Sequence, residues 1–135
     1  MSSTAISALV TDFMVNQRPV GNLLDVDIVT AHCMGATLFY AGYSDLAEWR
    51  DLPVTDPITP YADISETTTL NASEWAIIKP LFMLYLEREN ALYLESSRGM
   101  GVEQFGRTSS EVIGDITAYE MEMPHKAFCL EIVTV

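Results

Sequence analysis

The sequence predicts a mainly α-helical protein: a small helical bundle with one long central helix, a long Pro-rich loop and an extended, β-like C-terminal arm. Apolar residues recur at helical spacing in several separate stretches. The 135 residues suit one ordinary domain, and 49% hydrophobic against 19% charged residues is a globular composition. We expect residues 1–123 to form the helical domain and residues 124–135 to form the arm.

The first expected helix covers residues 4–16 and is amphipathic. The motif RPVG, Arg18–Gly21, should end it because proline and glycine interrupt helices. Its apolar face contains Ile6, Leu9, Val10, Phe13 and Met14.

The second expected helix covers residues 22–48, with Asn22 as its N-cap and acidic residues in its first turns. Glycines within a helix cost about 1 kcal/mol each relative to alanine. The small residues therefore indicate either close packing against a neighbour or a break near Gly42. The face expected to pack contains Leu24, Ile28, Ala31, Gly35, Leu38 and Gly42.

The Pro-rich loop is expected at residues 49–70, because Pro53, Pro57 and Pro60 exclude a helix there. One extended segment is expected around Ile64–Leu70. Long connections in compact domains tend to serve function or interaction.

The third helix is expected to start at Asn71, which forms a capping-box pattern with Glu74. It would cover about 28 residues and span about 40 Å. Its first half, Trp75–Leu86, is apolar on nearly every side, and a chain of 15.0 kDa has few other helices to cover it. We therefore expect other subunits to cover this stretch. Pro80 either lies in the first turns or kinks the helix.

The last helix is expected from the capping box of Thr108 and Glu111 to Met123, with Pro124 ending it. The remaining tail is rich in β-forming residues and alternates, with Phe128, Leu130 and Ile132 on one side and Val133 on the other. A lone strand needs a partner for its backbone groups. The tail would therefore pair either with residues 49–70 or with another chain.

Charge restricts the partners of the protein. Seven basic and 19 acidic residues give a net charge of −12, which opposes tight binding to nucleic acids or anionic membranes. The imbalance indicates either simple solubility or an acidic surface past which a nucleic acid can move without adhering. The longest apolar stretch, residues 28–43, is shorter than a membrane span.

The sequence contains no pattern of catalytic, metal-binding or cofactor-binding residues, so we expect no enzyme. His32 and Cys33 are adjacent, and on a helix their side chains diverge, so His32 is expected to be a core histidine. Cys33 and Cys129 are expected to be small buried hydrophobic residues of a protein made in a reducing cytoplasm. No signal peptide is recognisable.

The segments SEWAIIKPLF, LERENA and ESSRGMGVEQFGR, within Ser73–Val112, resemble part of the head-to-tail connector, or neck adaptor, proteins of tailed bacteriophages. The resemblance implies a virion protein that forms a ring of twelve copies around the DNA channel. The portal protein would lie above the ring and a tail or collar protein below it. The C-terminal arm would dock on the portal, and DNA would be met only as the passing genome.

We therefore predict a structural subunit of a phage head-to-tail connector. The alternative is a small acidic binding module, an inhibitor or DNA mimic acting on a host protein. The residues expected to form the protein interface are Trp75, Ile78, Phe82, Tyr85, Arg88, Arg98, Phe128, Leu130, Ile132 and Val133.

Overall fold

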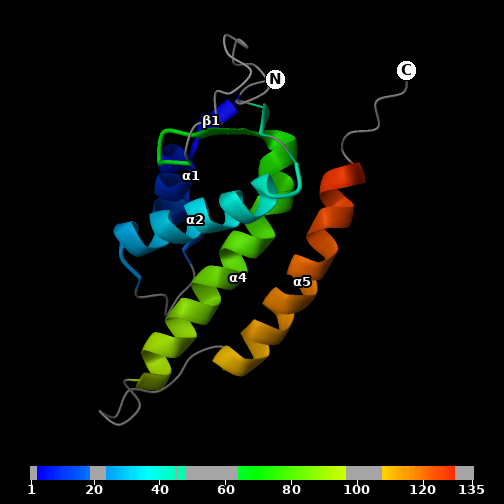
Figure 1. Cartoon of the computed structure of the whole chain (residues 1–135). Coiled ribbons are helices and arrows are strands. Elements are labelled where there is room, and N and C mark those ends of the chain that lie inside the picture. The colour runs from blue at the N-terminus through cyan, green and yellow to red at the C-terminus, as the bar shows by residue number, and fades with distance from the viewer. Residues whose placement is uncertain (1–2, 19–23, 45, 48–63, 97–107, 130–135) are drawn as a thin grey trace, which may run out of the picture.

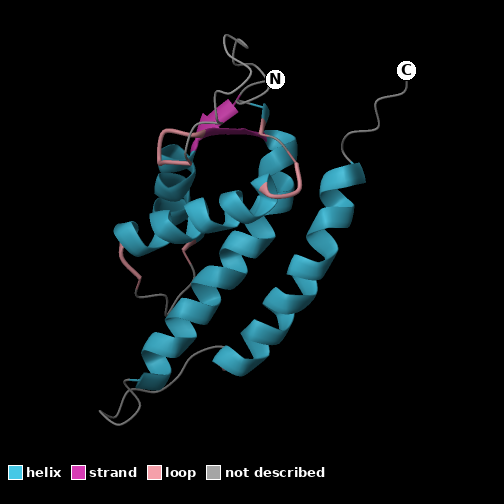
Figure 2. Ribbon diagram, in the orientation of Figure 1, coloured by secondary structure: helices cyan, strands magenta, loops and turns pink. Residues whose placement is uncertain are grey.

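Helices dominate the structure, a computed structural model that describes residues 3–18, 24–44, 46–47, 64–96 and 108–129 (Figure 2). The predicted mainly α-helical class is confirmed, and a small two-stranded sheet accompanies the helices. The elements are β1 (Ser3–Ala5), α1 (Ile6–Asp12), the π-helix η1 (Phe13–Gln17), α2 (Val26–Ala41), β2 (Thr69–Asn71), α4 (Ala72–Ser96) and α5 (Ser109–Cys129).

Helix α4 forms the axis of the molecule (Figure 1). Helix α5 runs back alongside α4, and α2 crosses α4 while also packing on α1. One core cluster joins these helices, and the ring of Phe13 meets that of Phe82 edge-on at 5.5 Å. The largest completely enclosed side chains include Ile6, Val10, Phe13, Tyr40, Ile78, Leu81, Phe82, Leu86 and Met123.

The two strands tie the start of the chain to the start of α4. They pair antiparallel, with Ser3 opposite Asn71 and Ala5 opposite Thr69. The same contact continues into α1, because the amide of Ile6 donates to the carbonyl of Thr68 at 2.9 Å. Of the extended segment predicted around Ile64–Leu70, only Thr69 and Leu70 belong to β2, and residues 66–67 form a turn. The sequence did not predict β1.

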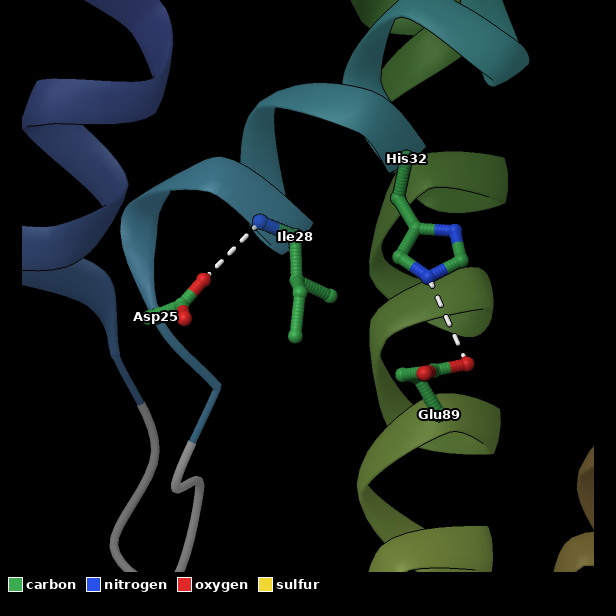
Figure 3. A network of polar contacts seen from close by, with 4 residues as sticks. All are labelled: Asp25, Ile28, His32 and Glu89. Atoms are coloured by element: carbon green, nitrogen blue, oxygen red, sulfur yellow. Dashed lines mark hydrogen bonds and ion pairs between the residues drawn. The ribbon is translucent and has the colours of Figure 1, made fainter.

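Helix α2 starts later and ends earlier than predicted. Asp25 is its N-cap and accepts a hydrogen bond from the amide of Ile28 at 3.1 Å (Figure 3), whereas Asn22 lies outside the described residues. Gly42 is the C-cap, which favours the predicted break over close packing. A Cβ atom placed on Gly35 would meet nothing within 4 Å among the described residues, so none of their backbone approaches there.

The buried face of α2 also differs from the predicted one. Of the predicted face, Leu24 is buried and Ile28 packs against the core, but Ala31, Gly35, Leu38 and Gly42 lie on the outer side, where Leu38 is 64% exposed. The buried residues are instead Val29, Cys33, Ala36, Thr37 and Tyr40.

The predicted capping box of α4 is confirmed in both directions. The amide of Glu74 donates to Oδ1 of Asn71 at 2.9 Å, and the amide of Asn71 donates to Oε1 of Glu74 at 3.0 Å. The carboxylate of Glu74 accepts a second hydrogen bond, at Oε2, from the amide of Ala47 at 2.9 Å. These donors explain how a carboxylate that is only 2% exposed can be buried.

Pro80 lies inside α4, and helix α5 packs beside it. A proline at this position cannot donate to the carbonyl of Ala76. One residue further along, the carbonyl of Ile77 accepts a hydrogen bond from the hydroxyl of Tyr119 at 2.5 Å. This contact joins α5 to the proline-containing turn of α4.

Helix α5 starts where Thr108 accepts from the amide of Glu111 at 3.4 Å. Glu95 of α4 holds the same end, accepting from the amide and the hydroxyl of Ser109 at 2.8 Å each. The prediction that Pro124 ends this helix is wrong, because α5 continues to Cys129. Met123 is completely buried and Lys126 lies 4.4 Å from the centre of the Tyr119 ring, so side chains on both sides of the proline hold the last turns in place.

Candidate protein-docking surface

The predicted interface on α4 is largely the core of the chain itself. Ile78 and Phe82 are completely buried, because η1, α2 and α5 surround the first half of α4. They are therefore not available to another subunit in this fold. The chain itself buries Ile77, Ile78, Leu81, Phe82 and Leu86, contrary to the expectation that it cannot cover Trp75–Leu86. Trp75, Met83, Leu84 and Tyr85 pack against the same core but stay partly exposed.

The other predicted interface residues divide into two groups. Trp75, Tyr85 and Arg88 are partly exposed but contact their own chain: Trp75 packs on Phe82 at 5.7 Å, and the Arg88 guanidinium lies 5.3 Å from the centre of the Tyr85 ring. The backbone of Phe128 belongs to α5, and its side chain is outside the description. The remaining four, Arg98, Leu130, Ile132 and Val133, lie outside the described residues.

A polar cluster occupies the crossing of α2 and α4. Nε2 of His32 lies 3.6 Å from Oε2 of Glu89 (Figure 3), and the His32 ring lies 6.1 Å from that of Tyr85. Burial lowers the pKa of His32, although the neighbouring Glu89 opposes this effect. Burial, together with a hydrogen bond to Glu120 of α5, raises the pKa of Tyr85 to about 12. The cluster therefore links three helices. The His32 and Tyr85 side chains in it are uncharged near neutral pH.

The burial of Cys33 does not suit it to act as a nucleophile with His32 as its base. Cys33 is completely buried, and burial raises the pKa of its thiol to about 12, so it stays protonated. This agrees with the prediction of a small buried hydrophobic residue. Within the described ranges, no group of three or more His, Cys, Asp or Glu side chains could hold a metal ion.

The outer side of α2 carries an apolar depression, which we call the α2 hollow. It has a volume of about 340 Å³ and is lined by Met34, Gly35, Leu38 and Ile64. Leu38 is 64% exposed at this place. No described helix therefore packs against the predicted stripe at Gly35.

The two described segments that line the α2 hollow each carry an exposed carboxylate. Asp27 precedes Gly35 by eight residues, about two helical turns, and Glu66 follows Ile64 by two residues. Both side chains are exposed. Neither α2 nor the described segment 64–71 contains a lysine or an arginine.

Large apolar side chains are also exposed at other described positions: Val15 of η1, Val26 of α2, Tyr43 just after α2, Leu92 and Tyr93 of α4, and Ile113 and Met121 of α5. Met121 is 77% exposed and Val15 74%. An exposed apolar side chain on its own needs no functional explanation. Among the described helices, none combines the length and the hydropathy needed to cross a bilayer.

No protein-family model matches this sequence, and no curated protein or solved structure is significantly similar to it. The resemblance of Ser73–Val112 to phage neck adaptors therefore stays a prediction.

Proposed function

We propose that this protein is a structural assembly subunit that works by binding other proteins, and that it acts in the neck of a tailed bacteriophage. The single observation that carries the proposal is the α2 hollow, an open apolar depression whose rim residue Leu38 is 64% exposed. Contiguous apolar depressions on otherwise polar surfaces mark sites of protein association.

The more specific proposal of a role in the phage neck rests on the resemblance of Ser73–Val112 to connector subunits. In such a particle each copy meets sister copies in a twelve-membered ring and also meets unlike proteins, the portal above and the tail or collar below. The net charge of −12 suits this place, because an acidic ring lets the genome pass without binding its phosphates.

Native mass spectrometry and negative-stain electron microscopy of the purified chain over a range of concentrations test the proposal. Closed rings, or rings that form when the portal protein of the same phage is added, are the expected result. Mass spectrometry of purified particles should find the chain in a fixed ratio to the portal. A chain that stays monomeric with and without the portal, and is missing from particles, would contradict the proposal.

A second candidate is an inhibitor or DNA mimic, and the charge of −12 favours it. Such a protein would cover the basic surface of a host nuclease or polymerase. A stoichiometric complex with one of these enzymes, formed without any portal protein and competed by duplex DNA, would favour the inhibitor over the neck adaptor.

A further inference from the structure

We infer that the α2 hollow receives an apolar segment with basic flanks from a different protein, and not a second copy of this chain. The inference rests on the proposed role as an assembly subunit and specifies one of its partners. Three observations support the inference: the shape of the hollow, the charges on the segments that line it, and the net charge of the whole chain.

The shape of the hollow suits a helix laid against α2. Met34, Leu38 and Ile64 line the hollow with apolar side chains, and Gly35 lines it without a side chain. A Cβ atom on Gly35 would meet no atom of the described residues within 4 Å. A partner backbone can therefore come close to α2 at this point, and amphipathic helices bind apolar grooves in this way.

The charges decide which chain can occupy this place. Asp27 of α2 and Glu66 of the segment 64–71 are exposed, and these two described segments, which supply the lining residues, have no lysine or arginine. Two copies joined through this face would bring like charges together. Because each copy also carries a net charge of −12, a second copy is the poorer occupant, and a basic partner gains from the same field.

Direct binding measurements can test this occupant with defined peptides. The probe is a fluorescein-labelled helical peptide of about 15 residues, roughly four turns, with leucines along one face and lysines elsewhere. The control peptide replaces every lysine with glutamate. Fluorescence anisotropy should show binding of the lysine peptide, weakened by added salt, and about tenfold weaker binding of the glutamate peptide.

Two matched pairs of variants locate the binding. Leu38→Asp should weaken the lysine peptide about tenfold or more, as expected when a large apolar contact is lost, whereas Met121→Asp makes the same charge change on α5 and should have no effect. Gly35→Ala should weaken binding although it raises the thermal midpoint, because alanine favours the helix but fills part of the hollow. Gly114→Ala should raise the midpoint and leave binding unchanged.

Three results would overturn the inference. One is equal binding of the lysine peptide to the Leu38→Asp and Met121→Asp variants, which would show attraction to net charge alone. Another is equal binding of both peptides. The third is self-association of the chain, seen by sedimentation, that Leu38→Asp removes. Rings seen by microscopy together with any of these results would leave the neck proposal intact, so the two failures can be told apart.

Discussion

The carboxylate of Glu74 accepts a hydrogen bond from the amide of Ala47, 27 residues earlier in the chain, at 2.9 Å. The same carboxylate closes the capping box with Asn71 at 3.0 Å. One side chain thus holds the first turn of α4 and also the segment that follows α2. A local helix cap has become a long-range contact between two parts of the fold.

Replacing Glu74 with glutamine tests this double role. In glutamine, one of the two carboxylate oxygens becomes an NH₂ group. That NH₂ would face the backbone N–H of Ala47 or Asn71, and two donors cannot bond, so a buried polar group is left unsatisfied. We expect Glu74→Gln to lower the free energy of unfolding by about 2 kcal/mol. Urea denaturation measures it, with Glu111→Gln on the exposed start of α5 as the control. Equal stability of the two variants would contradict the role assigned to Glu74.

The buried stretch of α4 makes a second prediction. Phe82→Ala should cost about 3–5 kcal/mol, because it opens a cavity between Phe13 and Trp75. Leu38→Ala, at an exposed position, should change stability by less than about 0.5 kcal/mol. Thermal and urea unfolding separate the two. A stable Phe82→Ala protein that loses only its self-association would restore the interface that the sequence predicted.

The hydroxyl of Tyr119 supports the proline-containing turn of α4. Tyr119→Phe removes the hydrogen bond to the carbonyl of Ile77 but keeps the ring under Lys126. We expect a loss of about 1 kcal/mol. Tyr93→Phe, at a tyrosine that is 54% exposed, makes the same chemical change and should be neutral. Amide hydrogen exchange around residues 76–81 should rise only in Tyr119→Phe.

Acid should loosen the crossing of α2 and α4. Burial lowers the pKa of His32 below its ordinary 6.5, so the unfolded chain takes up a proton more readily than the folded one. The stability that His32 contributes is present above pH 6.5 and is lost as the pH falls through that value towards the lowered pKa. Glu89 offsets part of the loss, and Arg88 adds to it.

Urea midpoints at about pH 7.5 and about pH 5.5 bracket this histidine titration. His32→Gln should show a smaller drop between the two pH values than the wild-type protein. His125→Gln, the same substitution at an exposed position of α5, should keep the full drop. If both variants behaved alike, His32 would not be the group responsible.

Local signals were predicted well from the sequence. The capping box of Asn71 and Glu74 lies within one turn of chain, and its spacing alone defines the bonds that form. The first helix is similar, since its predicted apolar face meets the core as α1 and η1. In both places the residues that decide the structure are close together in sequence.

Features that depend on distant residues were missed. Helix α2 has apolar residues all round, so periodicity could not show that Val29 and Cys33 face inwards while Leu38 faces out. The α2 hollow also needs Ile64, which belongs to another part of the chain. Strand β1 is only three residues long and has no pattern of its own; its pairing with β2 defines it.

Pro124 shows the limit of a strong local rule. Proline removes one helical hydrogen bond, and this cost usually ends a helix. The buried side chain of Met123 and the contact between Lys126 and Tyr119 outweigh it here.

Glu95 and Ser109 together have a consequence for how the chain can vary. Their two 2.8 Å hydrogen bonds hold the start of α5 against the end of α4. Lengthening a connection costs little entropy, about 0.6 kcal/mol for each doubling. Related proteins could therefore gain or lose residues between these two anchors and still stack the same pair of helices, and an engineer could place a tag or a reporter there.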